Sequence, residues 1–315
     1  MEWTRRGALF GLAAVAGLAP LRGVAGAPDV TRLAGRAFGT AWQVRARGLS
    51  DPQALAGRIG ATLDRLDRSL SPFRPDSEVT RFNTVSAEMA VSEDFARVAC
   101  AALDHAAASG GAFDPTLGPL VNRWGFGPIK GGREGDWRRI ALDGALIRRE
   151  GRVTFDPCGI AKGHAVDLVA ALLSARTDDW LVEIGGEIRV SGDWRIGISD
   201  PLTGGIHARI RPGSGAVATS GDQVNGFDLG RGAARRWSHA IDPLTGAPVE
   251  GRIASVSVLA ESAMAADALA TALWVMGEAR APAHAEAQGV GLLLLLREGE
   301  GLRAVMNARF AAALA

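Results

Sequence analysis

A glycine-rich turn in the middle of the chain, DPCGIAKGHAVD at residues 156–167, carries residue types that could bind a phosphate group. Gly159 and Gly163 bracket Lys162, and an amphipathic run follows at once. A glycine-rich turn that leads into a helix presents unpaired backbone N–H groups and the positive end of the helix dipole, and both favour phosphate. The same pattern also occurs as an ordinary glycine-capped turn. Since the turn matches neither a Walker A loop nor a G-x-G-x-x-G fingerprint, it leaves both interpretations open when taken alone.

A second loop, SHAIDPLTG at residues 238–246, contains the best candidate for a general base. His239 lies between a serine and an Asp-Pro-x-Thr-Gly turn, and Asp242, three residues on, could orient its imidazole. The ordinary pKa of a histidine lies near neutral pH, which suits a general base. A hydrogen-bonded structural histidine is the alternative interpretation.

A third loop, FDPTLGPLVNRWGFG at residues 113–127, places an aromatic ring and a carboxylate side by side before a proline. Phe113 offers the ring and Asp114 the carboxylate. An aspartate in a turn usually accepts hydrogen bonds from nearby backbone N–H groups. A structural role and a ligand-binding role for Asp114 therefore both remain open from the residues alone.

A carboxylate and a hydroxyl share one face of a helix that we predict over residues 263–276, after Ser262 as a good N-cap. Asp267 and Thr271 are four residues apart and hence one helical turn apart. Both are hard oxygen ligands of the kind that Mg²⁺ uses beside substrate phosphates, although this spacing is also common without a metal. No histidine or cysteine pair has zinc spacing and no G-x-S-x-G elbow occurs, which argues against zinc chemistry and the hydrolase elbow.

These stretches, together with AVATSGD at 216–222 and SAMAADALATALWVMG at 262–277, occur in the order found in the ApbE family, the FAD:protein FMN transferases. The chain resembles this family from about residue 38 to about residue 277. The resemblance implies an enzyme that transfers the FMN moiety of FAD onto a Thr or Ser hydroxyl of a target flavoprotein and releases AMP. It also implies Mg²⁺ as cofactor, FAD as substrate, and as acceptor a membrane-bound electron-transfer subunit with a periplasm-exposed Thr or Ser.

The resemblance also assigns roles to particular residues. The metal site would use Asp267, Thr271 and the backbone carbonyl of Ala161, while position 270, a carboxylate in some relatives, is Ala270 here. The residues that line FAD would be Phe38, Phe73, Ala112, Phe113, Asp114, Cys158, His164 and Ile241. Many relatives carry Met in place of Phe38 and a small or hydroxylic residue in place of Cys158, and Glu183 stands where Asn or Asp is expected.

The implied mechanism is a phosphoryl-type transfer, in which positioning and charge neutralisation supply most of the rate. The FAD pyrophosphate would lie over residues 159–163, His239 would take the proton of the acceptor hydroxyl, and Lys162 would help to neutralise developing charge. Three alternatives stay open: a pyrophosphatase that splits FAD into AMP and FMN, a non-catalytic periplasmic FAD-binding or assembly protein, and an unrelated exported α+β binding protein.

The N-terminus resembles an export signal over residues 1–27, which leaves residues 28–315 as the transferase domain. Arg5 and Arg6 precede an uncharged run at residues 7–21 that is short for a transmembrane span of about 20 apolar residues. The paired arginines favour the twin-arginine route, and cleavage could follow Ala25 or Ala27. No cysteine lies nearby, so we expect a periplasmic protein without a lipoprotein anchor.

The 315 residues carry a net charge of +1 with both signs interspersed, which gives no indication of a nucleic-acid partner. The pattern predicts a single large α+β unit, to which the family resemblance adds a duplicated, T-fold-like layering of sheet and helices. We predict helices at 52–70, 95–108, 164–175 and 263–276 and strands at 37–47, 180–191, 195–198, 253–259 and 292–296. Cys100 is expected to be a buried thiol, and no disulfide with Cys158 is expected.

Overall fold

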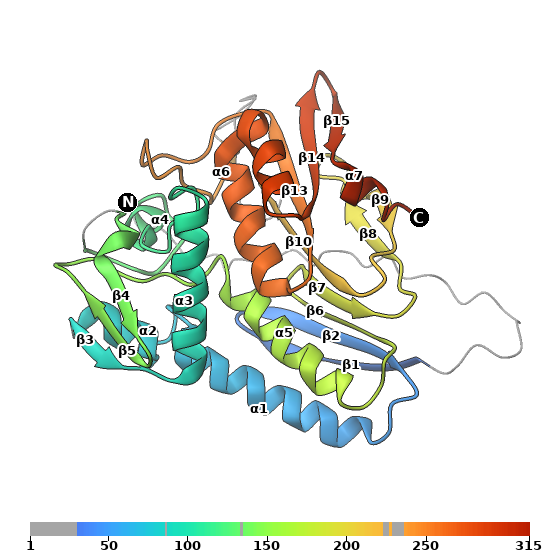
Figure 1. Ribbon diagram of the computed structural model, residues 1–315, viewed down its shortest axis with the longest axis horizontal. Helices are drawn as coiled ribbons and strands as arrows, with labels where there is room; N and C mark the ends of the chain where they lie inside the picture. Colours follow the sequence, from blue (N-terminus) through green and yellow to red (C-terminus); the bar gives the residue numbers. More distant parts are fainter. Residues whose placement is uncertain (1–29, 86, 133–134, 223–226, 229–235) are drawn as a thin grey trace, which may run out of the picture.

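The computed structural model describes residues 30–85, 87–132, 135–222, 227–228 and 236–315 (Figure 1). The predicted export signal lies outside these residues. Within them, mixed helices and antiparallel sheets confirm the α+β class, while the duplicated layering stays a prediction. No helix of the described part is long and apolar enough to cross a membrane.

An eight-stranded sheet, antiparallel throughout, forms the centre of the molecule, in the order β1-β2-β6-β7-β10-β13-β14-β15. Its strands are β1 Val30–Ala37, β2 Thr40–Arg47, β6 Trp180–Ile184, β7 Glu187–Ser191, β10 Gly215–Gly221, β13 Ile253–Ala260, β14 Gly291–Glu298 and β15 Gly301–Met306. The leucine run 292–296 lies in β14 and is buried on both faces, as predicted. Its even-numbered leucines belong to the main core and its odd-numbered ones to a second cluster behind the sheet.

Two of the predicted strands have different bounds in the structure. Phe38 and Gly39 adopt positive φ angles of 51° and 72° and form the turn between β1 and β2, so strand 37–47 was predicted too long at its start. Gly185 and Gly186, with φ of 63° and 107°, likewise divide 180–191 into β6 and β7. The glycine pair permits this turn because glycine adopts positive φ without steric cost.

Three long helices cover one face of the sheet (Figure 1): α1 Pro52–Leu70, α5 Ala161–Ser174 and α6 Ala263–Ala287. The first was predicted to the residue, and α5 begins three residues earlier than predicted. Gly277 adopts a non-helical conformation (φ 74°, ψ 174°) and divides α6 into two helical segments, so the first segment ends before this glycine as predicted. The opposite face is covered by β8 Ile196–Ser199, β9 Ile206–Ile210 and α7 Ala308–Ala311.

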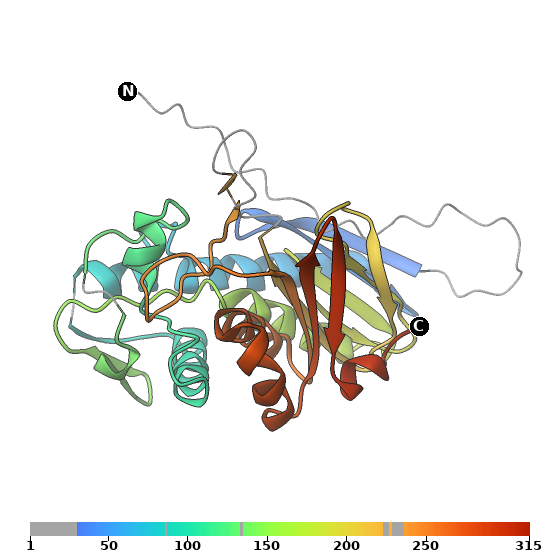
Figure 2. The same cartoon turned by 90° about the horizontal axis from the view of Figure 1, so that it is seen from above.

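The remaining elements lie beside the main sheet (Figure 2). They are α2 Glu78–Thr84, β3 Glu88–Ala90, α3 Glu93–Ala108, α4 Gly118–Arg123, η1 Trp137–Arg139, β4 Ile140–Asp143, β5 Leu146–Arg149, β11 Phe227–Asp228 and β12 Arg236–Trp237. Phe82, Phe95 and Phe155 pack together in their interior, with ring centroids 6.2 and 5.3 Å apart, and belong to the same core cluster as the main sheet. The two parts therefore share one hydrophobic core. Cys100, on α3, is exposed, so the prediction of a buried thiol is wrong, and both cysteines are free.

Candidate active site

The glycine-rich turn leads directly into α5, as the phosphate-binding interpretation requires. Pro157 O accepts hydrogen bonds from the N–H groups of Ile160 and Ala161 at 3.0 and 2.9 Å, which closes the turn. Ile160 makes no side-chain cap, so the first N–H groups of α5 have no side-chain partner from this position. Lys162 and Gly163 lie in the first helical turn, where the dipole is most positive.

The N-termini of α5 and α6 touch at Gly163. A Cβ at this position would lie 2.3 Å from Ala263 O and 2.6 Å from Met264 Cα, both backbone atoms. Asp167, one turn on in α5, accepts from the N–H groups of Ala263 and Met264 at 2.9 and 3.0 Å and so caps α6. These contacts at Gly163 and Asp167 fix the start of α6 against the glycine-rich turn.

We expect Gly163→Ala to lower the free energy of unfolding by about 1–3 kcal/mol or more, because the added methyl overlaps backbone that has no room to move. Gly60→Ala is the matched control, since a Cβ there meets nothing within 4 Å in the exposed face of α1. That substitution should stabilise by roughly 0.5–1 kcal/mol. Urea unfolding of both variants measures the contrast, and equal stabilities would show that the helices are not in contact here.

A cluster of two buried carboxylates and one partly buried ammonium lies where α5 and α6 meet. Asp267 is 4% exposed, and its Oδ2 accepts the N–H of Gly163 at 3.1 Å. Lys162 Nζ lies 3.9 Å from Asp267 Oδ1 and 2.6 Å from Oε1 of Glu187, the first residue of β7. With all three groups ionised, the cluster carries a net charge of −1.

The protonation of this cluster follows from its burial. Burial raises the pKa of Asp267, against the lowering effects of Lys162 and of the Gly163 N–H, and it raises the pKa of Glu187 as well. Burial alone would lower the pKa of Lys162, but the carboxylates of Asp267 and Glu187 outweigh it and raise that pKa above its ordinary value. The ammonium therefore stays charged, and the two carboxylates take up a proton more readily than they would in water.

The residues implied for the metal fit Mg²⁺ by donor chemistry. Thr271 Oγ1 makes only a long 3.4 Å hydrogen bond to Asp267 O, and it would lie 3.4 Å from a Cβ at Gly159, so it borders the turn. Ala270 is fully buried and offers no side-chain donor. Among the described residues no group of three or more His, Cys, Asp or Glu could hold a metal. Such a sparse set of oxygens suits Mg²⁺, which keeps waters and substrate phosphates as its other ligands.

Several of the residues implied for FAD lie next to this cluster. Ala112 and Phe113 are buried, and Phe113 Cε2 would lie 3.2 Å from a Cβ at Gly159, so the ring packs on the turn. Cys158 is exposed in the same turn. Asp114 Oδ1 accepts from the N–H and hydroxyl of Thr116 at 2.8 and 2.5 Å, so its carboxylate shapes the loop, and burial raises its pKa.

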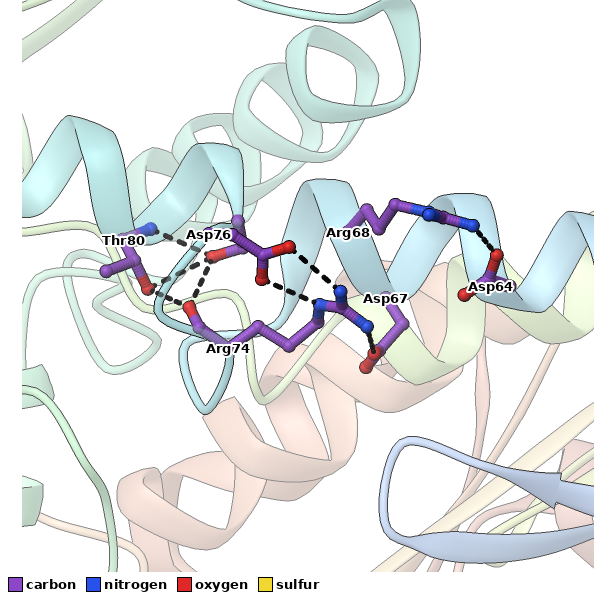
Figure 3. A network of polar contacts seen from close by, with 7 residues as sticks. Asp64, Asp67, Arg68, Arg74, Asp76 and Thr80 are labelled. Atoms are coloured by element: carbon purple, nitrogen blue, oxygen red, sulfur yellow. Dashed lines mark hydrogen bonds and ion pairs between the residues drawn. The ribbon is translucent and has the colours of Figure 1, made fainter.

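Phe73 lies on a rigid loop that holds its ring in solvent, with 64% of the residue exposed. Arg74 fixes the loop: its guanidinium contacts Asp67 of α1 at 3.1 Å and Asp76 at 3.0 and 3.1 Å, and its carbonyl accepts from Thr80 Oγ1 at 2.6 Å (Figure 3). An exposed aromatic ring on a fixed loop is a suitable platform for a planar ligand ring.

The other implied FAD residues lie in different surroundings. Phe38 lines a small depression of about 150 Å³ against α1, at the β1–β2 turn. His164 is 2% exposed, and its Nε2 lies 3.2 Å from Asp94 Oδ1 on α3; burial lowers its pKa to about 4. A neutral, buried imidazole bonded to a neighbouring helix has a packing role in the structure. Ile241 is buried against Leu117 and Leu120.

Aromatic rings, and not Asp242, hold the imidazole of His239. The ring lies edge-on to Phe126 and to Trp274 of α6, with centroids 6.3 and 5.7 Å away. Asp242 instead accepts from Leu244 N and Thr245 Oγ1 at 2.9 and 3.3 Å, so its carboxylate is engaged in its own turn. Trp274 follows Thr271 by three residues on α6, which places the His239 loop beside the helix that carries Asp267.

Sequence reasoning missed Glu187, Phe126 and Trp274. The only sequence signal for Glu187 is the Gly-Gly turn that precedes it, since the glycines reverse the chain and set its direction. The two aromatic residues occur within the loop and helix that the sequence had singled out, but nothing in their spacing points to a histidine.

Comparison with known proteins identifies the family of this chain. The model of the ApbE family matches residues 38–294. The FAD:protein FMN transferase of Vibrio cholerae is 36% identical, over 95% of this chain and 97% of that protein. The protein of the same name from Haemophilus influenzae is 33% identical, over 93% and 94%. The solved structure of flavin transferase ApbE from Vibrio cholerae superposes with a TM-score of 0.82 at 34% identity, covering 91% of this chain and 99% of that one.

The fold and the buried oxygen-donor site thus place this chain in the class that these flavin transferases represent. The chain belongs to the ApbE family, because the family model spans most of its length and relatives above 30% identity cover nearly all of it.

Proposed function

We propose that this chain is an FAD:protein FMN transferase that moves the FMN moiety of FAD onto a Thr or Ser hydroxyl of a target flavoprotein and releases AMP. The observation that carries the proposal is the Lys162–Asp267–Glu187 cluster at the N-terminus of α5, within a chain that matches the ApbE family over residues 38–294. With both carboxylates ionised, the cluster is net negative, and beside a helix N-terminus it would suit a divalent cation together with a pyrophosphate.

Asp267, Thr271 and the carbonyl of Ala161 would hold Mg²⁺, which when bound supplies positive charge to phosphate oxygens. The start of α5 directs its dipole at the pyrophosphate, and the Lys162 ammonium adds a fixed positive charge. Both groups act on charge that develops on the departing phosphate.

His239 serves as general base in this proposal. It takes the proton of the acceptor hydroxyl, whose oxygen forms a new bond to the FMN-side phosphorus while the bond from that phosphorus to the bridging oxygen breaks. AMP leaves with the bonding electron pair, and FMN remains on the acceptor as a phosphoester. The rings of Phe126 and Trp274 restrict the tilt of the imidazole and exclude water from its edges.

The reaction is tested by incubating the purified chain with FAD, Mg²⁺ and candidate membrane flavoproteins, followed by in-gel flavin fluorescence and AMP quantification. A fluorescent acceptor band with an equal amount of AMP supports the transferase. AMP and free FMN without labelled acceptor would instead identify a pyrophosphatase, and intact FAD after long incubation would identify a binding or assembly protein.

We further propose that the chain is exported by the twin-arginine route, folded around FAD, and acts in the periplasm on a membrane-bound electron-transfer subunit. Arg5 and Arg6 motivate the route, since that pathway takes folded cargo and a bound ligand stabilises the native state. Replacing both with Lys should leave a full-length, FAD-competent enzyme inside the cell. Cell fractionation measures this, and efficient export of the double variant would refute the route.

A further inference from the structure

Glu187 carries a buried carboxylate, one oxygen of which has no hydrogen-bond partner among the described residues. The residue is 5% exposed, and its Oε1 accepts from Lys162 Nζ at 2.6 Å. Its Oε2 is buried and has no hydrogen-bond partner in the described part of the chain. Leaving a buried acceptor unsatisfied costs about 1–3 kcal/mol, so such a group calls for a functional explanation.

The position of Glu187 is set by the hairpin between β6 and β7. Gly185 has a φ of 63°, and a Cβ there would lie 3.6 Å from Cδ of Lys162, so the turn packs along the lysine stem. Two residues later the chain enters β7, and Glu187 meets the ammonium at the end of that stem. The lysine is thus held along its length as well as at its charged end.

Lys162 lies between two carboxylates but bonds only one of them. Its Nζ is at hydrogen-bond distance from Glu187 and 3.9 Å from Asp267 Oδ1, which is beyond it. The other oxygen of Asp267 already accepts the N–H of Gly163. Oδ1 is therefore the oxygen of this carboxylate left for a cation, and a closer Lys162 would take it.

We propose that Glu187 is a positioning residue that holds the Lys162 ammonium away from Asp267 Oδ1 and so keeps this oxygen available to a divalent cation. Without the negative charge at position 187, the ammonium turns to the remaining carboxylate and shortens its contact with Asp267 Oδ1 from 3.9 Å to hydrogen-bond distance. The metal then has to compete with an internal cation. This inference rests on the proposed metal site, but its test measures metal binding and not transfer.

The rival explanation is that Glu187 only neutralises a partly buried lysine. That explanation predicts a loss of stability in Glu187→Gln with no selective effect on metal binding. The two explanations also differ in what happens when the lysine is removed as well. If the ammonium is the competitor, deleting it restores the metal site; if Glu187 acts by itself, deleting Lys162 restores nothing.

The test is Mn²⁺ binding to the metal-free chain, without FAD, measured by the loss of the free-ion EPR signal; Mn²⁺ prefers the same oxygen ligands as Mg²⁺. We expect Glu187→Gln to weaken Mn²⁺ binding by roughly 10–100-fold, the usual effect of losing a group that supports a metal ligand. Lys162→Met should bind Mn²⁺ at least as tightly as the parent chain. Combining Lys162→Met with Glu187→Gln should restore most of the lost affinity.

Glu183→Gln is the matched control. Glu183 is 7% exposed on the same hairpin, but its carboxylate bonds Gln43 of β2, so this change should leave Mn²⁺ affinity unaltered. Circular dichroism checks the fold of each variant, and Glu187→Asp, which shortens the reach to Lys162, replaces Glu187→Gln if that variant does not fold.

Unchanged affinity in Glu187→Gln, or a double variant as weak as the single one, would overturn the inference. A parent chain that binds no Mn²⁺ either alone or with FAD present would instead overturn the metal part of the proposed function, and with it the reason for the inference.

Discussion

Asp267→Asn should lower transfer by about 10²–10³-fold or more while leaving the fold intact. The amide oxygen of asparagine can still accept the N–H of Gly163, which Asp267 Oδ2 does at 3.1 Å. What is lost is the negative charge that the proposed metal requires and that balances Lys162 at 3.9 Å. In-gel flavin fluorescence with a fixed acceptor measures the rate, and near-parent transfer, or transfer by the parent chain in chelated buffer, would refute the metal assignment.

The same variant should be at least as stable as the parent in metal-free buffer at neutral pH. Burial raises the folded-state pKa of Asp267 above its unfolded value near 3.8, so folding disfavours the ionised form. The stability contributed by this group is present below that unfolded pKa and is lost as the pH rises through the raised folded pKa. Thermal unfolding with EDTA from pH 4 to 8 should therefore show the advantage of the variant growing with pH, and Mg²⁺ should raise the Tm of the parent alone.

The sequence predicted local elements best where one physical signal dominated. Helix α1 has its predicted bounds because Asp51 caps Ala54 N at 3.1 Å and the apolar residues at positions 55, 59, 63 and 66 all face the core. The strand predicted at 37–47 begins only at Thr40, because Phe38 takes a left-handed conformation that alternation cannot reveal. The first segment of α6 ends before Gly277 as predicted, and the second segment, which buries Ala281 and Ala285, was not predicted because it depends on tertiary packing.

The sequence likewise predicted some residues of the candidate site and missed others. Asp267 and Lys162 were identified within motifs, and the structure brings them together because α5 and α6 meet at Gly163. Glu187 was missed because its contact with Lys162 spans 25 positions and depends on how a hairpin packs on a helix. Asp242 was assigned to the imidazole on sequence proximity, but its own turn offered nearer donors. Short-range hydrogen-bond partners thus outcompete those that spacing suggests.

His239→Ala should retain FAD binding and lose transfer by about 10²–10⁴-fold, the usual contribution of general-base catalysis. The imidazole contacts Phe126 and Trp274 edge-on. Its removal therefore leaves the Lys162–Asp267–Glu187 cluster and the contact between the N-termini of α5 and α6 in place. FAD affinity by fluorescence quenching and the single-turnover rate with saturating acceptor separate binding from chemistry.

The control for this variant is His207→Ala, since His207 lies in β9 on the opposite face of the sheet, with its Nδ1 3.7 Å from Asp200. It should transfer flavin at the parent rate. The pH dependence supplies a second readout: if His239 removes the acceptor proton, the parent loses activity as the pH falls and the imidazole is protonated, and this limb disappears in His239→Ala. An unchanged rate, or a loss fully explained by weaker FAD binding, would exclude His239 as the base and leave proton removal to another group in the site.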